Sequence, residues 1–379
     1  MQRNYLNKMY VPFFDLKVAQ ESSLLDLRQA FDRVISSGAF ILGAEVERFE
    51  LQFADFLEVG NAVGVSNGLD ALVLALEVLG IGPGDEVIVP SNTYVASVLA
   101  VLRVGALPVF SEPHPITGLL DADELHKVMT RKTRALLPVH LYGNPVDMAS
   151  IMQFAKDHKL WVVEDNAQAV GARWKGRHTG TWGHVNATSF YPTKNLGALG
   201  DAGCVTTQDE KWARKVRSLR NYGSSKKYYN ELLGYNMRLD ELQAAFLTAK
   251  LKHLDRWNQE RREISEHYDA AFGVCEGVEL VPVLEGGESV RHLYVCRVKN
   301  RPELQAVLDT AGIGHLVHYP IPPHLQPACS SLGKRKGDYP VAEQWAEELI
   351  SLPLWPGMKQ EEIQHVATTV AGLYGKASC

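Results

Sequence analysis

Residues 189–197 read Ser-Phe-Tyr-Pro-Thr-Lys-Asn-Leu-Gly, so Lys194 comes just after a short β-branched and aromatic run. Upstream, residues 161–168 read Trp-Val-Val-Glu-Asp-Asn-Ala-Gln, where an apolar run ends in an acid, Asp165. Short apolar runs of this kind are typical of buried strands. The two stretches therefore predict two strands of one sheet, with Asp165 and Lys194 at or just beyond the strand ends.

Between residues 60 and 210 such runs alternate with helix-length segments such as 69–79, 94–104 and 148–158. The expected strands are Ala62–Val65, Glu86–Val89, Leu107–Phe110, Ala135–Val139, Trp161–Glu164, Ala187–Phe190 and Cys204–Thr207. The alternation predicts an α/β fold with a mainly parallel, seven-stranded sheet covered on both faces. Ligands of such sheets bind beyond the carboxyl ends of the strands, which is where Gly68, Asp165 and Lys194 fall.

A second domain is expected because 379 residues exceed the size at which a single core usually stops growing. An apolar stripe at helical spacing predicts one long helix from about 239 to 270, long enough to bridge two domains. We therefore expect a large domain, residues 1–250 with an N-terminal arm, and a small α+β domain, residues 251–379. Strands at His292–Val298 and His315–Tyr319, a helix at 303–310 and a helix after Lys359 would build the small domain.

Composition narrows the functional classes. The net charge is −5 and no long run of one sign occurs, so neither nucleic-acid binding nor attraction to a membrane surface is indicated. Residues 1–10 lack the apolar core of a secretory signal, and no uncharged apolar stretch of about eighteen residues exists. Five scattered cysteines without a Cys-x-x-Cys pair suit reduced thiols. A cytoplasmic protein is expected.

Lys194 and Asp165 together suit the chemistry of pyridoxal phosphate (PLP). A lysine amine can form a Schiff base with the PLP aldehyde, and a carboxylate can keep the pyridine nitrogen protonated. Side chains alternate along a strand, so Asp165 and Ala167 should share a face that Asn166 does not. Each residue alone also has a plainer interpretation, since loop lysines are normally solvated and acids often cap helices.

Further residues can complete a PLP site. Gly68 lies in a strand-to-helix turn where backbone N–H groups can hold a phosphate, although the turn taken alone favours an ordinary capped helix start. Ser189 can add a hydroxyl to that phosphate. Gln168 can donate to the cofactor's phenolic oxygen, and Tyr94 can stack on its ring. Rossmann, Walker, His-Glu-x-x-His and Gly-x-Ser-x-Gly motifs are absent, so no metal site or catalytic triad is expected.

The chain resembles the DegT-type nucleotide-sugar aminotransferases over nearly its whole length, from Val11 to about Pro353. The motifs that carry the resemblance are Ser-Asn-Gly-Leu-Asp-Ala-Leu (66–72), Val-Pro-Ser-Asn-Thr-Tyr (89–94), Pro-Val-His-Leu-Tyr-Gly (138–143), Glu-Asp-Asn-Ala-Gln-Ala (164–169), Ser-Phe-Tyr-Pro-Thr-Lys-Asn (189–195), Leu-Arg-Asn-Tyr-Gly (219–223) and Tyr-Asn-Met-Arg-Leu-Asp-Glu-Leu-Gln-Ala-Ala (235–245).

The resemblance implies a fold-type-I, aspartate-aminotransferase-like PLP enzyme whose homodimer shares two active sites. In that pattern Lys194 is the Schiff-base lysine, Asp165 the pyridinium partner and Gln168 the phenolic-oxygen partner. The positions that match the phosphate-binding, ring-stacking and cross-subunit residues are Gly68, Leu69 (through its backbone), Ser189, Tyr94 and, reaching the neighbouring subunit's phosphate, Asn236. The family usually has alanine at position 166, and this chain departs from it with Asn166.

Residues 190–195 and 318–326 look most like the branch that aminates C3 of dTDP-3-keto-6-deoxyhexoses, with an amino acid, expected to be L-glutamate, as donor. The product would be a dTDP-3-amino-3,6-dideoxyhexose, and Tyr191, His318 and Tyr319 would face the sugar or phosphate. A C4-specific aminotransferase and a non-catalytic regulator with this fold remain alternatives. A related sugar dehydratase is disfavoured by Lys194, where its relatives have histidine, and a nicotinamide-dependent oxidoreductase by the missing Rossmann glycines.

Overall fold

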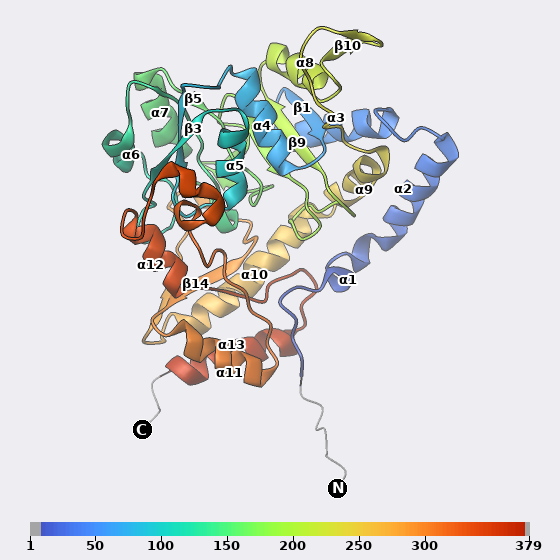
Figure 1. Ribbon diagram of the computed structural model, residues 1–379. Coiled ribbons are helices and arrows are strands. Elements are labelled where there is room, and N and C mark those ends of the chain that lie inside the picture. The colour runs from blue at the N-terminus through green and yellow to red at the C-terminus, as the bar shows by residue number, and fades with distance from the viewer. Residues whose placement is uncertain (1–8, 376–379) are drawn as a thin grey trace.

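A seven-stranded sheet forms the centre of the computed structural model, which describes residues 9–375 (Figure 1). Parallel strands in the order β3-β2-β4-β5 and antiparallel strands in the order β8-β9-β1 meet at Asp165, which bridges Val139 on one side and Ala187 on the other. Within this sheet only β9 runs against the others. The strands are β1 (Asn61–Val65), β2 (Glu86–Pro90), β3 (Leu107–Ser111), β4 (Thr133–Leu136), β5 (Trp161–Val162), β8 (Asn186–Ser189) and β9 (Gly203–Thr207). The predicted mainly parallel sheet is confirmed.

Helices cover this sheet because its strands are apolar on both faces; every residue of β2 and of β9 is buried. Helix α4 (Gly68–Val78) packs on β8 and β9, α5 (Val95–Arg103) on β2 and β3, and α8 (Glu210–Leu219) on β1 and β9. The other elements before residue 240 are α1 (Leu16–Ala19), α2 (Leu24–Ser37), α3 (Ala44–Leu57), α6 (Ala122–Val128), α7 (Met148–His158), β6 (Arg173–Trp174), β7 (Arg177–His178), β10 (Ser224–Lys226), β11 (Tyr229–Asn230) and the short 3-10 helices Glu21–Ser23 and Leu141–Gly143.

The prediction of a single long helix over 239–270 is wrong. Two helices, α9 (Glu241–Leu251) and α10 (Leu254–Phe272), are separated by a turn at Lys252 and His253. Both turn residues bind one carboxylate on α2: Lys252 Nζ lies 2.7 Å and His253 Nε2 3.0 Å from Asp26. This tertiary contact holds the chain in a turn that no glycine or proline marks in the sequence.

A second hydrophobic core lies around an antiparallel sheet of β12 (Val278–Leu280), β14 (Tyr294–Val298) and β15 (Leu349–Leu352). Helices α10, α11 (Arg301–Ala311) and α13 (Gln360–Tyr374) contribute further side chains to this core. This is the α+β arrangement expected for the small domain, and the division of the chain at residue 250 stays a prediction. None of the helices within residues 9–375 combines the length and apolar character needed to cross a bilayer.

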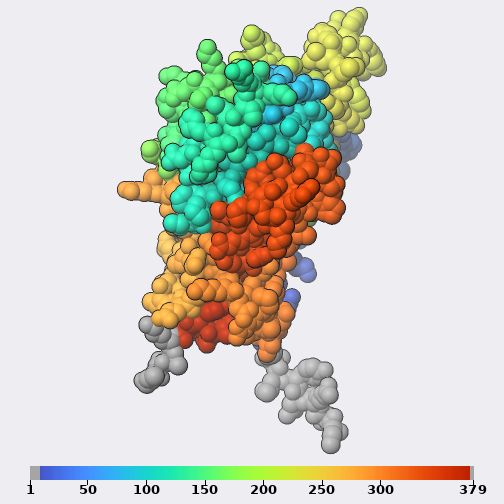
Figure 2. All heavy atoms as spheres, turned by 60° about the vertical axis from the view of Figure 1, so that its left-hand side comes forward, coloured from blue at the N-terminus to red at the C-terminus, as the bar shows by residue number. Residues whose placement is uncertain are grey.

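The strand predicted at His315–Tyr319 does not form. Only Leu316 makes a ladder contact there, an isolated bridge to Ser351, and prolines at positions 320, 322 and 323 follow at once. The chain then leaves the small domain: α12 (Pro340–Glu348) and the 3-10 helices Pro323–Leu325 and Pro327–Leu332 lie across the large domain, as the orange-red residues in Figure 2 show.

Side chains of the large domain anchor this crossing segment. Trp345 of α12 belongs to the hydrophobic core of the large domain. Glu112, just after β3, accepts hydrogen bonds from the Val341 and Ala342 N–H groups at the start of α12, at 2.8 and 3.2 Å. Such a carboxylate suits the positive end of a helix. The crossing therefore brings His318 and Tyr319 to the carboxyl edge of the central sheet.

Candidate active site

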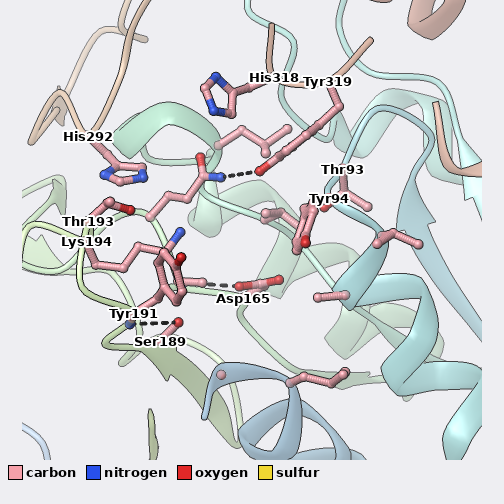
Figure 3. A pocket seen from close by; sticks show the side chains of 18 of the residues that line it. Thr93, Tyr94, Asp165, Ser189, Tyr191, Thr193, Lys194, His292, His318 and Tyr319 are labelled. Carbon is pink, nitrogen blue, oxygen red and sulfur yellow. Dashed lines mark hydrogen bonds between the residues drawn. The ribbon is translucent and has the colours of Figure 1, made fainter. Parts of the chain in front are cut away.

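A cavity of about 610 Å³ opens at the carboxyl edge of the sheet. All the predicted site residues except Asn236 line it: Gly68, Leu69, Tyr94, Asp165, Gln168, Ser189, Tyr191, Lys194, His318 and Tyr319. The structure thus brings together residues from four strand ends and from the segment after Leu316, as Figure 3 shows. Their individual chemical roles stay predictions.

Lys194 extends into this cavity toward Asp165 (Figure 3). A turn holds its backbone, because the Lys194 N–H donates to the Tyr191 carbonyl at 2.8 Å. Burial lowers the pKa of the Lys194 amine to about 8, while the charge of Asp165 acts in the opposite direction. A desolvated amine of this kind is more often unprotonated at neutral pH than a surface lysine, which is what a nucleophile requires.

Asp165 is buried, and each of its carboxylate oxygens accepts one hydrogen bond. Ser97 Oγ donates to Oδ2 at 2.8 Å, and the Ala167 N–H donates to Oδ1 at 3.1 Å. Burial raises the pKa of Asp165, and these two hydrogen bonds oppose that rise. The Ser97 hydroxyl lies 2.9 Å from that of Thr93, so a short chain of hydroxyl groups leads to the carboxylate.

The start of α4 leaves room for an anion. Asn67 caps the helix by accepting from the Asp70 N–H at 2.9 Å. A side chain at Gly68 would collide with Ser189, because a Cβ atom there would lie 2.5 Å from Ser189 Cβ. Glycine keeps the backbone of the first turn open to the cavity, next to the Ser189 hydroxyl. Helix N–H groups beside a hydroxyl fit a phosphate group.

The side-chain amide of Gln168 has a fixed orientation. Its Oε1 accepts from the Tyr142 N–H at 2.6 Å, and its Nε2 donates to Tyr319 Oη at 3.1 Å. One N–H of the amide is left for a ligand oxygen in the cavity. The rings of Tyr319 and Tyr94 pack against each other with centroids 4.9 Å apart.

A desolvated lysine, a buried carboxylate and an anion site around one cavity suit PLP chemistry, and comparison with known proteins agrees. The family model described as "DegT/DnrJ/EryC1/StrS aminotransferase family" matches residues 25–371. The chain belongs to this aminotransferase family. Its cofactor is PLP, and its fold is the type I fold of PLP enzymes.

Three proteins, among others, are similar in sequence to this chain over nearly its whole length. The chain is 48% identical to the erythromycin biosynthesis sensory transduction protein EryC1 of Saccharopolyspora erythraea, covering 96% of this chain and 99% of that one. It is 48% identical to the dTDP-3-amino-3,4,6-trideoxy-alpha-D-glucose transaminase of Streptomyces venezuelae (95% of each chain). It is 46% identical to the dTDP-3-amino-3,6-dideoxy-alpha-D-galactopyranose transaminase of Aneurinibacillus thermoaerophilus (95% and 98%).

A solved structure also matches over nearly the whole chain. The S. venezuelae protein DesV, in complex with a ketimine intermediate, has a TM-score of 0.94 and 47% sequence identity, covering 96% of this chain and 98% of that one. The fold of this chain, like its sequence motifs, is therefore that of the DegT/DnrJ/EryC1/StrS family.

In this family member the strand before the carboxylate alternates as predicted. Asp165 faces the cavity, whereas Glu164 and Asn166 are buried on the opposite side. Asn166 Oδ1 accepts from the Thr179 hydroxyl at 2.7 Å, so the departure from alanine serves a contact behind the site. Glu164 accepts from the backbone N–H groups of 180, 182 and 183 and from His140 Nε2, which holds the strand end in place.

His318 lies between the two domains. Its carbonyl accepts from the Tyr142 hydroxyl at 3.0 Å, and its Nδ1 lies 2.8 Å from Ser351 Oγ. Burial lowers the pKa of His318 to about 4, so its ring is neutral at physiological pH. Tyr191 lies at the rim of the cavity, 54% exposed.

Asn236 is the predicted site residue that this cavity does not include. It is exposed and makes a backbone bridge to Asn221. Its expected contact with the phosphate of a neighbouring subunit therefore stays a prediction. Sequence reasoning missed Thr93, Ser97 and His292, although the spacing of Thr93 and Ser97 by four residues at a helix start places them on one face. Within the described residues, no group of three or more His, Cys, Asp or Glu side chains could hold a metal ion.

Proposed function

We propose that this protein transfers an amino group from an amino acid to C3 of a dTDP-linked 3-keto-6-deoxyhexose and forms a dTDP-3-amino-3,6-dideoxyhexose. The observation that carries the chemistry is the desolvated Lys194 amine beside the buried Asp165 carboxylate. The regiochemistry rests on two relatives whose names place the amino group at C3.

The side chains around the cavity have different proposed roles. When bound, PLP supplies an electron-withdrawing ring that stabilises negative charge on a substrate carbon. Lys194 would hold the cofactor covalently through its Nζ, and the free Nζ would move a proton to or from the substrate carbon. Asp165 keeps the ring nitrogen protonated. Gly68 and Ser189 bind the phosphate group, while Gln168 offers its remaining N–H to the phenolic oxygen.

One experiment tests the substrate. The protein is incubated with L-glutamate and each C4 epimer of a dTDP-3-keto-6-deoxyhexose, and the position of the new amine is read by NMR. An amine at C3 supports the proposal. An amine at C4, or no reaction with either epimer, contradicts it. Replacing glutamate by other amino acids in the same assay identifies the donor.

A regulatory role is the second candidate, because the similar EryC1 is named a sensory transduction protein. The chain retains Lys194, Asp165 and Gln168 in one cavity, which a purely regulatory protein would not need. Adding glutamate to the purified, PLP-loaded protein discriminates the two. Loss of the visible absorbance of the bound cofactor identifies an enzyme, and an unchanged spectrum favours the regulator.

A homodimer with shared sites is part of the proposal. Exposed apolar side chains occur on α2, where Leu25 is 69% exposed, and in the segment before Asn236, where Leu233 is 95% exposed. Such side chains often mark interaction surfaces. Mixing inactive Lys194→Ala and Asn236→Ala proteins tests the sharing. A hybrid dimer would contain one intact site and recover activity. If the sites were independent, Asn236→Ala alone would be active, because Asn236 lies outside the cavity of its own subunit.

The place of action is inferred to be the cytoplasm. Four cysteines of the described chain are buried free thiols: Cys204, Cys275, Cys296 and Cys329. Reduced thiols suit that compartment. The fifth cysteine, Cys379, lies outside the described residues.

A further inference from the structure

His292, just before β14, lines the active-site cavity beside Thr193 and Lys194 (Figure 3). Its Nδ1 lies 3.0 Å from Oδ1 of Asn195, the residue that directly follows Lys194. Both His292 and Asn195 are buried, with 6% of each exposed. The imidazole ring is therefore tied to the same short loop that presents the lysine.

Two backbone carbonyls determine which nitrogen of His292 carries a proton. Asn195 Nδ2 lies 3.0 Å from the Val290 carbonyl, which can only accept, and 2.7 Å from Asn258 Oδ1. Asn258 Nδ2 in turn lies 3.1 Å from the Val170 carbonyl, which fixes the orientation of that amide as well. The atom left facing His292 is Asn195 Oδ1, an acceptor. His292 Nδ1 must therefore be the N–H donor.

The other ring nitrogen, Nε2, is then an acceptor. Burial lowers the pKa of His292 well below its ordinary value, and the positive charges of Lys194 and Arg261 act in the same direction, as does His318. The neutral ring with its proton on Nδ1 carries a lone pair on Nε2. Among residues 9–375 no side chain or backbone group hydrogen-bonds to Nε2, so the cavity holds an acceptor without a donor.

We propose that His292 Nε2 accepts a hydrogen bond from a hydroxyl group of the keto sugar, which makes His292 a residue that selects the amine acceptor. The inference rests on the proposed function. A carboxylate of the amino donor would be repelled by this lone pair, and the only N–H donor of glutamate is the amine that reacts with the cofactor. A sugar hydroxyl is the complementary group. His292 should therefore serve one half of the reaction and not the other.

The test separates the two half-reactions in a His292→Leu protein. Glutamate conversion is followed by the loss of the cofactor's visible absorbance, and sugar conversion by its return. We expect kcat/KM of the sugar half-reaction to fall by about 10- to 100-fold, the effect of leaving a buried hydroxyl without its partner. The glutamate half-reaction should stay within about twofold of wild type, a change smaller than the loss of one hydrogen bond causes. Calorimetric binding of the amino-sugar product should weaken in parallel with the sugar half-reaction.

Asn258→Leu is the matched control. It disturbs the same network, but the Val290 carbonyl still orients Asn195 and Nε2 is retained. This variant should lower the melting temperature and leave the ratio of the two half-reactions unchanged.

Three results would overturn the role of His292: equal loss in both half-reactions of the Leu variant, which would mean that Nε2 serves Lys194; loss in neither; or the same selective loss in the control. A wild-type protein that reacts with glutamate but not with the keto sugar would instead overturn the proposed function.

Discussion

The Ser97 hydroxyl donates a hydrogen bond of 2.8 Å to Asp165 Oδ2, and both side chains are buried. Ser97 lies on α5, the helix that follows β2. In the sheet, β4 separates β2 from β5, the strand that leads to Asp165. Burial raises the pKa of Asp165 and this hydrogen bond lowers it. Ser97 thus favours the ionised carboxylate, and the ionised form is the one that can hold a proton on a cofactor nitrogen.

The first prediction concerns Ser97→Ala. Without the hydroxyl, the pKa of Asp165 rises further, so more of the carboxyl group is protonated at a given pH. We expect the acid limb of the kcat–pH profile to move to higher pH and kcat near neutrality to fall by roughly tenfold, the net effect of one buried hydrogen bond. Thr93→Val, which removes only the partner of Ser97, should shift the profile less. An unchanged acid limb in Ser97→Ala would contradict the assigned role.

The second prediction concerns pH and the loading of cofactor-free protein. Only an unprotonated Lys194 amine can attack the PLP aldehyde, and burial lowers the pKa of that amine to about 8. The rate at which the visible absorbance appears after PLP is added should therefore rise with pH with a midpoint near 8. Because the Asp165 charge raises the pKa of Lys194, Asp165→Asn should move the midpoint to lower pH. A midpoint near that of a solvated lysine would show that Lys194 is not desolvated.

The third prediction compares two buried lysines. Burial lowers the pKa of Lys250 to about 8 as well, but its Nζ donates to the Gly197 carbonyl and lies outside the cavity. Lys194→Ala should abolish turnover and leave the far-UV circular dichroism spectrum intact. Lys250→Met should lower the melting temperature but keep the covalent link to the cofactor. Turnover by Lys194→Ala would rule out its assignment.

The sheet and the position of the site could be predicted because they depend on local patterns. Apolar runs about as long as a strand fix where Asp165 and Lys194 fall, and parallel strands bring their carboxyl ends to one edge. Such local patterns do not reveal side-chain contacts between segments that are far apart in the sequence. Asp26 breaks the long helix by binding Lys252 and His253, more than two hundred residues away in the sequence.

For the same reason, the sequence did not reveal the hydrogen-bond partners of Asp165 and of Asn195, the residue after Lys194. Ser97 reaches Asp165 across 68 positions and His292 reaches Asn195 across 97. A serine in an apolar helix and a histidine before a strand carry no spacing signal of their own. Only the folded arrangement shows that both assist groups which the sequence had already identified.

The last prediction tests the phosphate site through Gly68→Ala. The backbone of Gly68 does not have a positive φ angle, so alanine is not strained there, and its effect comes from contact alone. A Cβ atom 2.5 Å from Ser189 Cβ must push the start of α4 and the end of β8 apart. That movement displaces the N–H groups and the hydroxyl that are proposed to bind phosphate. We expect the dissociation constant of PLP, measured by equilibrium dialysis, to rise by about 10-fold or more, since each lost charge-assisted hydrogen bond costs about 1.5–3 kcal/mol.

Gly372→Ala provides the comparison for that measurement. Gly372 lies in α13, where a Cβ atom would meet nothing within 4 Å. Alanine there should raise the stability of the helix by up to about 1 kcal/mol and leave PLP affinity unchanged. If Gly68→Ala binds PLP as tightly as Gly372→Ala does, the start of α4 is not the phosphate site. A loss of PLP affinity in Gly68→Ala alone would place the phosphate between Gly68 and Ser189.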